Sequence, residues 1–438
     1  MKKLLLTLVG LGVIVLAAAL AFAFWPTHTR EIAAAPATDP SLIEKGRYLA
    51  YAGDCTACHT KPGGAAFAGG LPIASPLGTI YSSNITPDAE HGIGKYTLDQ
   101  FDRAVRHGIA ADGSSLYPAM PFPSYARMSD DDVRALYAYF LHGDIKPSTD
   151  PNRATDIAWP LSMRWPLAIW RKLFAPSPDA VAFDDKRYAD AKIARGAYLV
   201  EGLGHCGSCH TPRGFALQEK ALDEKGDGYL AGGQVIDGWF AVNLRGNTAD
   251  GLGRWSEQDI VDTLKTARNA HSAVVGQPMA DVAVHSTQHL SDDDLHAIAA
   301  YLKTLPASAN DPSSYAEDAT TGKALQAGVN DSRGAEIYVD NCAACHRTDA
   351  NGYAHVFPSI AGNPTVLAGD ATTLVRLILA GSHLPSTQAA PSPLGMPAFA
   401  DRLSDDEVAQ LATFVRGNFG NHAPAVDAAT VKKVRVSL

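Results

Sequence analysis

The chain has 438 residues, with 37 basic and 46 acidic side chains and a formal net charge of −9. A chain of this length usually folds around more than one hydrophobic core, so several domains are expected. Its composition of 46% hydrophobic and 19% charged residues argues against both wholesale disorder and a polytopic membrane protein. The acidic balance supplies no basic stripe for phosphates, which argues against nucleic acid as a partner.

The N-terminal segment, residues 1–25, differs from the rest of the chain. Lys2 and Lys3 precede a run that carries no charge up to Trp25. A basic end followed by an apolar run is typical of an export signal whose basic end stays in the cytoplasm. A signal peptide cleaved near Ala23 and a retained membrane anchor both stay open, because the run is also long enough to span a bilayer. In either case we expect the body of the protein outside the cytoplasm.

All six cysteines fall in three C-x-x-C-H motifs. The motifs are Cys55, Cys58 and His59; Cys206, Cys209 and His210; and Cys342, Cys345 and His346. Six cysteines in an exported protein would otherwise suggest disulfides, but this motif attaches c-type haem, with two thiols bonded to the porphyrin and the histidine under the iron. A zinc site needs two such pairs close together, and a redox pair needs no following histidine. The sequence therefore predicts three covalently bound haem c groups.

One predicted helix precedes each motif and another follows it. The earlier helices contain Gly46, Gly196 and Gly334 at similar places. Because a helical glycine costs about 1 kcal/mol, we expect another helix to approach each of them closely. The later helices begin with a serine and a carboxylate three residues on, the pattern of a capping box. These starts are Ser129 with Asp132, Ser291 with Asp294, and Ser404 with Glu407.

This repeat predicts an all-α fold of three tandem cytochrome c domains after the N-terminal signal or anchor. Apolar residues at helical spacing follow each serine, so one face of each later helix is expected to be buried. The predicted domains are 41–143, 190–305 and 330–420. The other predicted parts are the signal or anchor at 1–25, a Trp-rich linker at 144–189, a polar linker at 306–329 and a tail at 421–438.

The methionines suggest the second axial ligand of each iron. Met279 and Met396 are the only methionines of the second and third predicted domains, and both lie in loops that contain Pro or Gly. The first domain offers Met120 and Met128, but Met128 directly precedes the helix-starting serine, which is a core position. We therefore expect Met120, Met279 and Met396 to be ligands. The alternative is that each methionine fills a gap in the core.

Imidazole and thioether ligation has a chemical consequence. A soft thioether favours ferrous iron and raises the reduction potential, and a filled sixth position keeps small molecules away from the metal. Such haems transfer electrons and do not usually activate oxygen or peroxide. A haem peroxidase is therefore disfavoured.

The first linker combines Trp159, Trp165 and Trp170 with several basic residues. Aromatic side chains beside cations suit a membrane or quinone contact, or a contact with a dehydrogenase subunit. The third interpretation is a connector whose tryptophans hold the first two domains together. The role of the stretch from Trp159 to Phe174 stays open among these three. The basic tail after Asn421 either touches anionic lipid or is a frayed terminus.

Several passages carry a resemblance to a known family. They are residues 78–88, 116–121, 159–167 and 205–214. From Leu42 to about Ala425 the chain resembles the tri-haem cytochrome c subunit of bacterial membrane-bound alcohol, gluconate, sorbitol, fructose and glucose dehydrogenase complexes. The resemblance implies that a catalytic subunit with FAD or pyrroloquinoline quinone (PQQ) passes electrons to these haems, and that the haems pass the electrons to ubiquinone. It also implies that the protein lies at the periplasmic face of the inner membrane. The family's haem-attaching cysteines and axial ligands map onto the residues named above.

The chain itself offers no place for substrate oxidation. It contains no G-x-G-x-x-G between a strand and a helix, so no flavin or nucleotide fold is expected. We therefore expect an electron-transfer subunit whose substrate-oxidising site lies on another polypeptide. The alternatives are the cytochrome subunit of a molybdenum aldehyde dehydrogenase and a stand-alone electron carrier.

Overall fold

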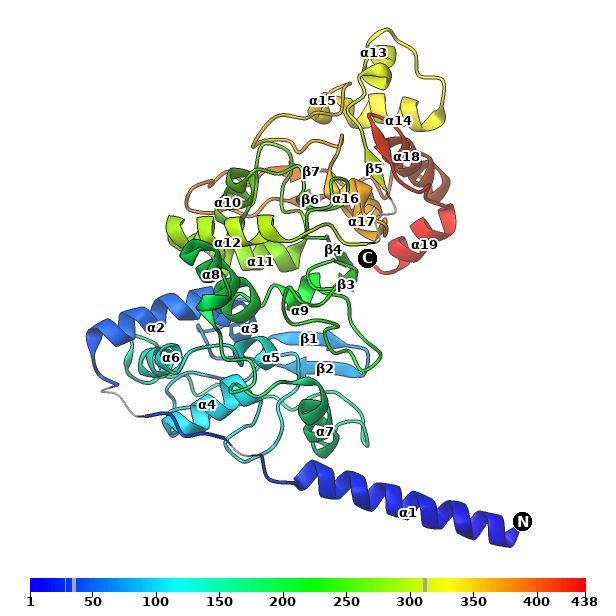
Figure 1. The fold of residues 1–438 in the computed structure, drawn as a ribbon. Helices are drawn as coiled ribbons and strands as arrows, with labels where there is room; N and C mark the ends of the chain where they lie inside the picture. The colour runs from blue at the N-terminus through cyan, green and yellow to red at the C-terminus, as the bar shows by residue number, and fades with distance from the viewer. Residues whose placement is uncertain (28, 34–36, 189, 310–312) are drawn as a thin grey trace. The chain divides into compact units, whose positions relative to one another are not determined.

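The computed structural model describes residues 1–438 except 28, 34–36, 189 and 310–312. The chain divides into two compact units, Met1–Asp184 and Asp185–Leu438 (Figure 1). The first unit contains the first predicted domain and nearly all of the Trp-rich linker. The second unit contains the other two predicted domains.

The first unit is mainly helical. Its elements are α1 (Lys2–Phe24), α2 (Pro40–Ala52), α3 (Cys55–His59), β1 (Pro72–Ser75), β2 (Gly78–Tyr81), α4 (Leu98–His107), α5 (Phe122–Tyr125), α6 (Asp130–His142) and α7 (Trp165–Phe174). The haem motif coincides with the short helix α3, between the packed pair α2 and α6 in chain order.

The second unit twice repeats the sequence of a helix, a short motif helix and a later helix that packs on the first. Its first part contains the 3-10 turn η1 (Asp185–Arg187), α8 (Ala191–Tyr198), the π-turn η2 (Leu199–Leu203), α9 (Gly207–His210), β3 (Gln234–Ile236), β4 (Trp239–Ala241), α10 (Glu257–Thr266), α11 (Gln277–His285), the 3-10 turn η3 (Thr287–His289) and α12 (Asp292–Thr304). Its second part contains β5 (Ser314–Tyr315), α13 (Thr320–Gln326), α14 (Arg333–Asn341), α15 (Ala343–His346), α16 (Pro364–Leu367), α17 (Thr372–Ala380), β6 (Ser382–His383), β7 (Gly395–Met396), α18 (Asp405–Gly417), β8 (Asn421–His422) and α19 (Ala428–Val436).

The predicted close approach of helices at the three glycines is confirmed. A Cβ atom on Gly46 or Gly196 would overlap the carbonyl oxygen of Ala135 or Ala297 on the facing helix. A Cβ on Gly334 would lie 2.6 Å from the carbonyl oxygen of Gln410. The helix pairs α2 with α6, α8 with α12, and α14 with α18 therefore pack with their backbones in contact.

The three later helices start where the sequence predicts. Ser129, Ser291 and Ser404 each accept a hydrogen bond from the backbone amide three residues on, a cap that contributes about 1 kcal/mol. The reciprocal bond of a full capping box is recorded for Glu407 at α18.

The carboxylate three residues after each capping serine also forms an ion pair with the facing helix. Asp132 lies 2.6 Å from Lys45, Asp294 lies 2.7 Å from Arg195, and Glu407 lies 2.6 Å from Arg333. Each basic residue directly precedes the glycine of the close approach. Ion pair and backbone contact thus lie next to each other in each helix pair.

The prediction of an all-α fold is only partly right. Four two-stranded antiparallel sheets, β1–β2, β3–β4, β5–β8 and β6–β7, interrupt the loops. The β3–β4 hairpin turns at Asp237 and Gly238, which both have positive φ (50° and 80°). An Asp-Gly pair of this kind favours a tight two-residue turn, so the loop after the second haem motif folds back on itself.

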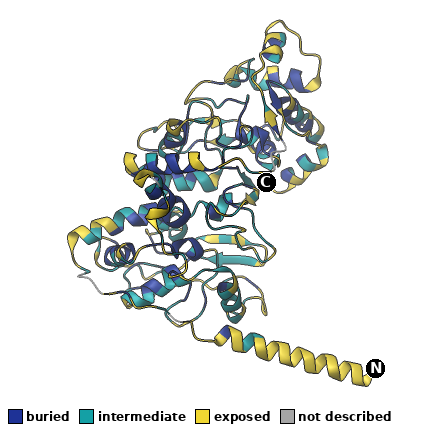
Figure 2. Cartoon of the chain, viewed as in Figure 1, coloured by how far each residue is buried: buried dark blue, intermediate teal, exposed yellow. Residues whose placement is uncertain are grey.

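Helix α1 is exposed along nearly its whole length (Figure 2). Within the described ranges it is the one helix long and apolar enough to cross a membrane. Its last turn contacts α7 of the same unit. The ammonium group of Lys172 donates to the carbonyls of Phe22, Ala23 and Trp25 at 2.6, 3.1 and 2.6 Å, which satisfies acceptors that a helix end otherwise leaves without partners.

The C-terminal tail is ordered, and the interpretation as a frayed terminus is wrong. Helix α19 buries Val431 and Val434 and packs against α17 and α18. Arg435 donates to Asp405 at 2.7 Å and to the carbonyl of Leu403 at 2.8 Å. The basic residues that suggested an exposed tail therefore include one that fixes the last helix to the third repeat.

Candidate functional site

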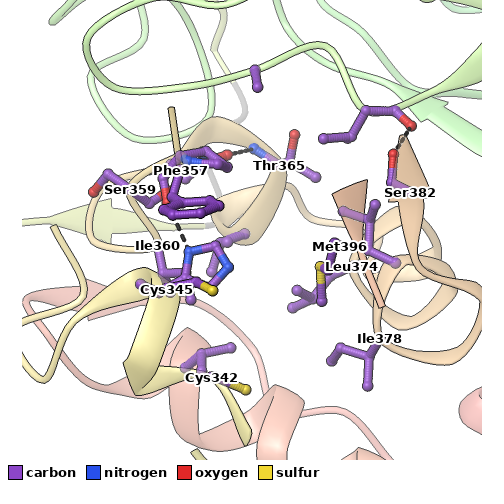
Figure 3. A pocket seen from close by; sticks show the side chains of 18 of the residues that line it. Cys342, Cys345, Phe357, Ser359, Ile360, Thr365, Leu374, Ile378, Ser382 and Met396 are labelled. Carbon is purple, nitrogen blue, oxygen red and sulfur yellow. Dashed lines mark hydrogen bonds between the residues drawn. The ribbon is translucent and has the colours of Figure 1, made fainter. Parts of the chain in front are cut away.

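The third haem motif lines a large apolar cavity (Figure 3). Cys342, Cys345 and His346 lie on its wall together with Met396, and we call it the Met396 cavity. Figure 3 shows Met396 across the open space from Cys345. Aliphatic and aromatic side chains form most of the remaining wall: Val356, Phe357, Ile360, Val366, Leu374, Leu377, Ile378, Leu384, Leu394, Phe399, Leu411 and Val415.

The wall of the Met396 cavity suits a haem by its chemistry. Its lining is mostly apolar and brings the four sulfur and nitrogen side chains of one motif and one methionine to the same space. An apolar wall with two thiols, one imidazole and one thioether has the donor set that haem c needs. The residues therefore fit a covalently bound haem.

The local backbone explains how the motif presents its side chains. Cys342 caps α15, and its carbonyl accepts hydrogen bonds from the amides of Cys345 at 3.2 Å and His346 at 2.9 Å. This single helical turn keeps both thiols and the imidazole within one short segment. Burial raises the pKa of Cys342 to about 12, so this thiol is neutral at physiological pH.

The three motif histidines share one hydrogen-bonding arrangement. The Nδ1 atoms of His59, His210 and His346 lie 2.7, 2.7 and 2.9 Å from the carbonyl oxygens of Ser83, Val242 and Pro358. Since a carbonyl only accepts, each Nδ1 carries the proton, and each neutral ring offers Nε2 as the metal-binding atom. Burial lowers the pKa of all three imidazoles, which keeps that lone pair available.

The thiols of the first two motifs have similar surroundings. Burial raises the pKa of Cys55 and Cys206 to about 12. Cys55 and His59 are the first and last residues of α3, and Cys206 caps α9, which ends at His210. The same short helical turn therefore presents cysteine and histidine in each of the three repeats.

The predicted methionine ligands occupy different kinds of element. Met396 lies in β7 and pairs with Ser382 of β6. Met279 lies in the first turn of α11, beside the buried residues Ala267 and Val274. Met120 lies in the loop before α5 and is partly buried. Met396 lines the same cavity as its motif, and the axial roles of all three methionines stay predictions.

Met128 is 3% exposed, which confirms its predicted place in the core. It follows α5 and directly precedes the serine that caps α6. Sequence position thus separated the structural methionine of the first unit from the candidate ligand.

Helix α7 shows what part of the Trp-rich linker does. Arg164 stacks its guanidinium 4.0 Å from the ring centre of Tyr117, in the loop that leads to Met120. Trp170 packs edge-on against Phe122 of α5. These contacts support the Met120 loop within the first unit, whereas Trp159 is 79% exposed. Sequence analysis missed the role of Arg164, whose only signal was its place among the tryptophans.

Comparison with protein families identifies cytochrome c sequences along most of the chain. Residues 193–306 and 332–418 match the family described as "Cytochrome c". Residues 42–140 match the family described as "Cytochrome C oxidase, cbb3-type, subunit III".

Curated relatives are similar over nearly the whole chain. The cytochrome c subunit of the alcohol dehydrogenase (quinone) of Gluconobacter oxydans (strain 621H) is 51% identical over 420 residues, covering 95% of this chain and 86% of the relative. The gluconate 2-dehydrogenase cytochrome c subunit of Pantoea cypripedii is 52% identical over 400 residues, covering 90% of each. The fructose dehydrogenase cytochrome subunit of Gluconobacter japonicus is 40% identical over 413 residues, covering 90% of this chain and 82% of the relative. The chain therefore belongs to the family of dehydrogenase cytochrome c subunits, whose cofactor is covalently bound haem c.

Proposed function

We propose that this protein carries electrons through three haem c groups, from the catalytic subunit of a dehydrogenase complex to membrane ubiquinone. The observation that carries the proposal is the Met396 cavity, where Cys342, Cys345, His346 and Met396 line one apolar space. Haem c, when bound, supplies reversible one-electron transfer at its iron.

The proposed attachment residues follow the repeat. The thioether bonds to haem would come from three cysteine pairs, which are Cys55 and Cys58, Cys206 and Cys209, and Cys342 and Cys345. The proposed axial ligands are His59 with Met120, His210 with Met279, and His346 with Met396. The recurring carbonyl acceptor at Nδ1 of each histidine supports this assignment, because it orients the ring and fixes the tautomer before the metal binds.

The surrounding side chains determine which chemistry the site allows. Leu374 and Ile378 belong to the apolar wall of the Met396 cavity and would limit the access of water to a bound haem, which would tune its reduction potential. A methionine ligand would leave the bound iron without an open coordination site for oxygen. These features favour electron transfer over oxygen or peroxide chemistry.

The partners are proposed from the relatives. They are cytochrome c subunits of alcohol, gluconate and fructose dehydrogenases, one of which is named as quinone-linked. We propose a catalytic partner that contains FAD or PQQ and oxidises an alcohol, a polyol, gluconate or glucose. Electrons then pass through this chain to ubiquinone.

The proposed location is the periplasmic face of the inner membrane, with α1 retained as an anchor. The exposed apolar surface of α1 supports membrane insertion. The three hydrogen bonds from Lys172 to the end of α1 support retention, because they make that end part of the folded first unit.

Purification of the native complex from detergent-solubilised membranes tests this proposal. We expect a catalytic subunit with bound FAD or PQQ to co-purify, and the complex to reduce a soluble ubiquinone analogue when the substrate of that subunit is added. Recovery of this chain alone from the aqueous fraction would contradict the proposal, as would a complex that oxidises substrate without reducing the quinone.

A further inference from the structure

A segment of the second predicted domain forms part of the wall of the Met396 cavity. We call residues 268–275 the shared segment. Its residues Ala273 and Val275 line the cavity beside His346 and Met396. The shared segment follows α10 and leads directly through Gly276 to Met279, the proposed ligand of the second haem. One short stretch of chain therefore belongs to the surroundings of two proposed haem ligands.

The shared segment supports the histidine side of the Met396 cavity. The carbonyl of His271 accepts a hydrogen bond from the amide of Ser359 at 3.0 Å. Ser359 follows Pro358, whose carbonyl holds Nδ1 of His346 at 2.9 Å. The carbonyl of Asn269 accepts from a second amide of the same loop at 3.1 Å. The loop that orients His346 is thus hydrogen-bonded to the preceding domain.

The shared segment also supports the methionine side. The hydroxyl of Ser382 donates to the carbonyl of Val275 at 2.9 Å, and Figure 3 shows this bond at the edge of the cavity. Ser382 lies in β6 opposite Met396 of β7. Arg268 donates to two carbonyls of the loop between these strands, at 3.1 and 2.9 Å. The hairpin that carries Met396 is therefore held from outside its own domain.

A buried asparagine fixes the shared segment to its own domain. Asn269 is 2% exposed. Its amide nitrogen donates to the carbonyl of Asp259 at 3.2 Å and to the hydroxyl of Thr263 at 2.9 Å, both on α10. Its side-chain oxygen accepts from the amides of His271 and Ser272 at 2.7 and 2.6 Å. These bonds hold the segment in one conformation within its own domain, so we expect a displacement at one end of the segment to shift the other end as well.

We propose that the shared segment couples the Met279 and Met396 positions, so that the second and third haem sites behave as one unit, and that Ser382 is a positioning residue for both. This inference rests on the proposed assignment of Met279 and Met396 as axial ligands. Coupling of this kind is a free energy shared between two sites, so it acts in both directions. A change on the Ser382 side must then reach Met279, four residues beyond Val275.

Carbon-13 labelling of the methionine methyl groups tests the inference on the ferrous holoprotein. The chain has only six methionines, so the methyl NMR spectrum can be assigned with single Met→Leu variants. A methyl group next to a ferrous haem iron is shifted far upfield by the porphyrin ring current, which reports its position without any activity measurement. We expect Ser382→Ala to shift the signals of both Met279 and Met396, and Met120 to stay unchanged as an internal reference.

Two variants serve as controls for the loss of a hydroxyl. Ser386 lies in the loop between β6 and β7. Its hydroxyl donates to the carbonyl of Pro391, also at 2.9 Å, and this bond does not involve the shared segment. Ser386→Ala is expected to leave both methyl signals in place. Ser382→Thr keeps the hydroxyl and is expected to restore the wild-type spectrum.

A second readout uses exogenous imidazole, which competes with the methionine for iron. Losing one hydrogen bond of typical net strength corresponds to about a fivefold change in an equilibrium. We therefore expect imidazole to displace both methionines of Ser382→Ala at about fivefold lower concentration than in the wild type.

The outcomes separate the inference from the proposed function. If the wild type shows upfield methyl signals for Met279 and Met396 but Ser382→Ala moves only Met396, or neither, the coupling is refuted while the axial ligands stand. If the wild type shows no upfield signal for either methionine, the axial assignment fails, and the inference fails with it.

Discussion

The close contact between α8 and α12 can be tested by adding one methyl group. Gly196→Ala places a Cβ over the carbonyl of Ala297, 2.5 Å from the carbonyl carbon and 2.8 Å from Cβ of Tyr301. Ordinary contacts between carbon atoms begin near ~3.5 Å, so the two helices must separate by about 1 Å. The obstacle is backbone, which has no rotamer into which to move.

Two opposing effects set the expected stability change. Alanine favours the helix over glycine by about 1 kcal/mol. Overpacking costs about 1–3 kcal/mol, and an immovable backbone places this case at the upper end. We expect a net loss of about 2 kcal/mol, which makes the slowest amides of α8 and α12 exchange with deuterium about 30-fold faster.

Hydrogen exchange followed by mass spectrometry measures this change locally, which matters because a chain of several domains has no single unfolding transition. The matched control is Gly417→Ala in the last turn of α18, where a Cβ meets nothing within 4 Å. That variant is expected to exchange at the wild-type rate or more slowly. If Gly196→Ala behaved in the same way, α8 and α12 would not be in backbone contact, and the account of the repeated glycines would be wrong.

Three further predictions concern the ligands, the ion pairs and the anchor. Met396→Leu is expected to lower the midpoint potential of one haem and to let that iron bind carbon monoxide, as seen in redox titration and difference spectra, whereas Met128→Leu changes neither. Bonds from Arg333 and from the capping serine lower the pKa of Glu407 to about 2. Because the folded-state pKa is depressed, the stabilisation by Glu407 is complete above its ordinary pKa of about 4.5 and is lost as the pH falls towards 2. The slowest amides of α18 should therefore exchange faster in Glu407→Gln than in the wild type at pH 7 and at equal rates near pH 2, and a difference that persists in acid would refute this cause. Protein extracted from membranes is expected to retain α1, and a mature N-terminus just after Ala23 in peptide mass spectrometry would contradict the anchor.

Much of the helical framework could be predicted because its signals are local. A serine followed by carboxylates marks a helix start wherever it occurs, and Ser129, Ser291 and Ser404 all cap helices as expected. A repeated glycine indicates a close neighbour because no other advantage offsets its cost in a helix. The identity of that neighbour needed the fold.

Other features depend on partners that are distant in the sequence. The acceptors of the motif histidines are backbone carbonyls of Ser83, Val242 and Pro358, and a backbone carbonyl leaves no trace in residue identity. The contact between the shared segment and Ser382 is hidden for the same reason. The β3–β4 hairpin is different, since the Asp237-Gly238 pair is a sequence signal for a hairpin turn that the all-α interpretation does not take into account.

The interpretation of the Trp-rich linker needed the structure for a further reason. Its composition is compatible with a membrane contact, a protein partner and internal packing. Arg164 and Trp170 turn inward to support the Met120 loop and α5, whereas Trp159 faces outward. Trp159 and Trp170 therefore have different environments within one segment, which composition alone does not distinguish.

The intact mass of the exported protein, measured under denaturing conditions, tests the central claim most directly, because thioether bonds survive unfolding. The account predicts the mass of the polypeptide plus three haems, with one haem lost in the double variant Cys342→Ala/Cys345→Ala and likewise for each of the other two cysteine pairs. A polypeptide that carries no haem, or that loses none when a cysteine pair is removed, would contradict it.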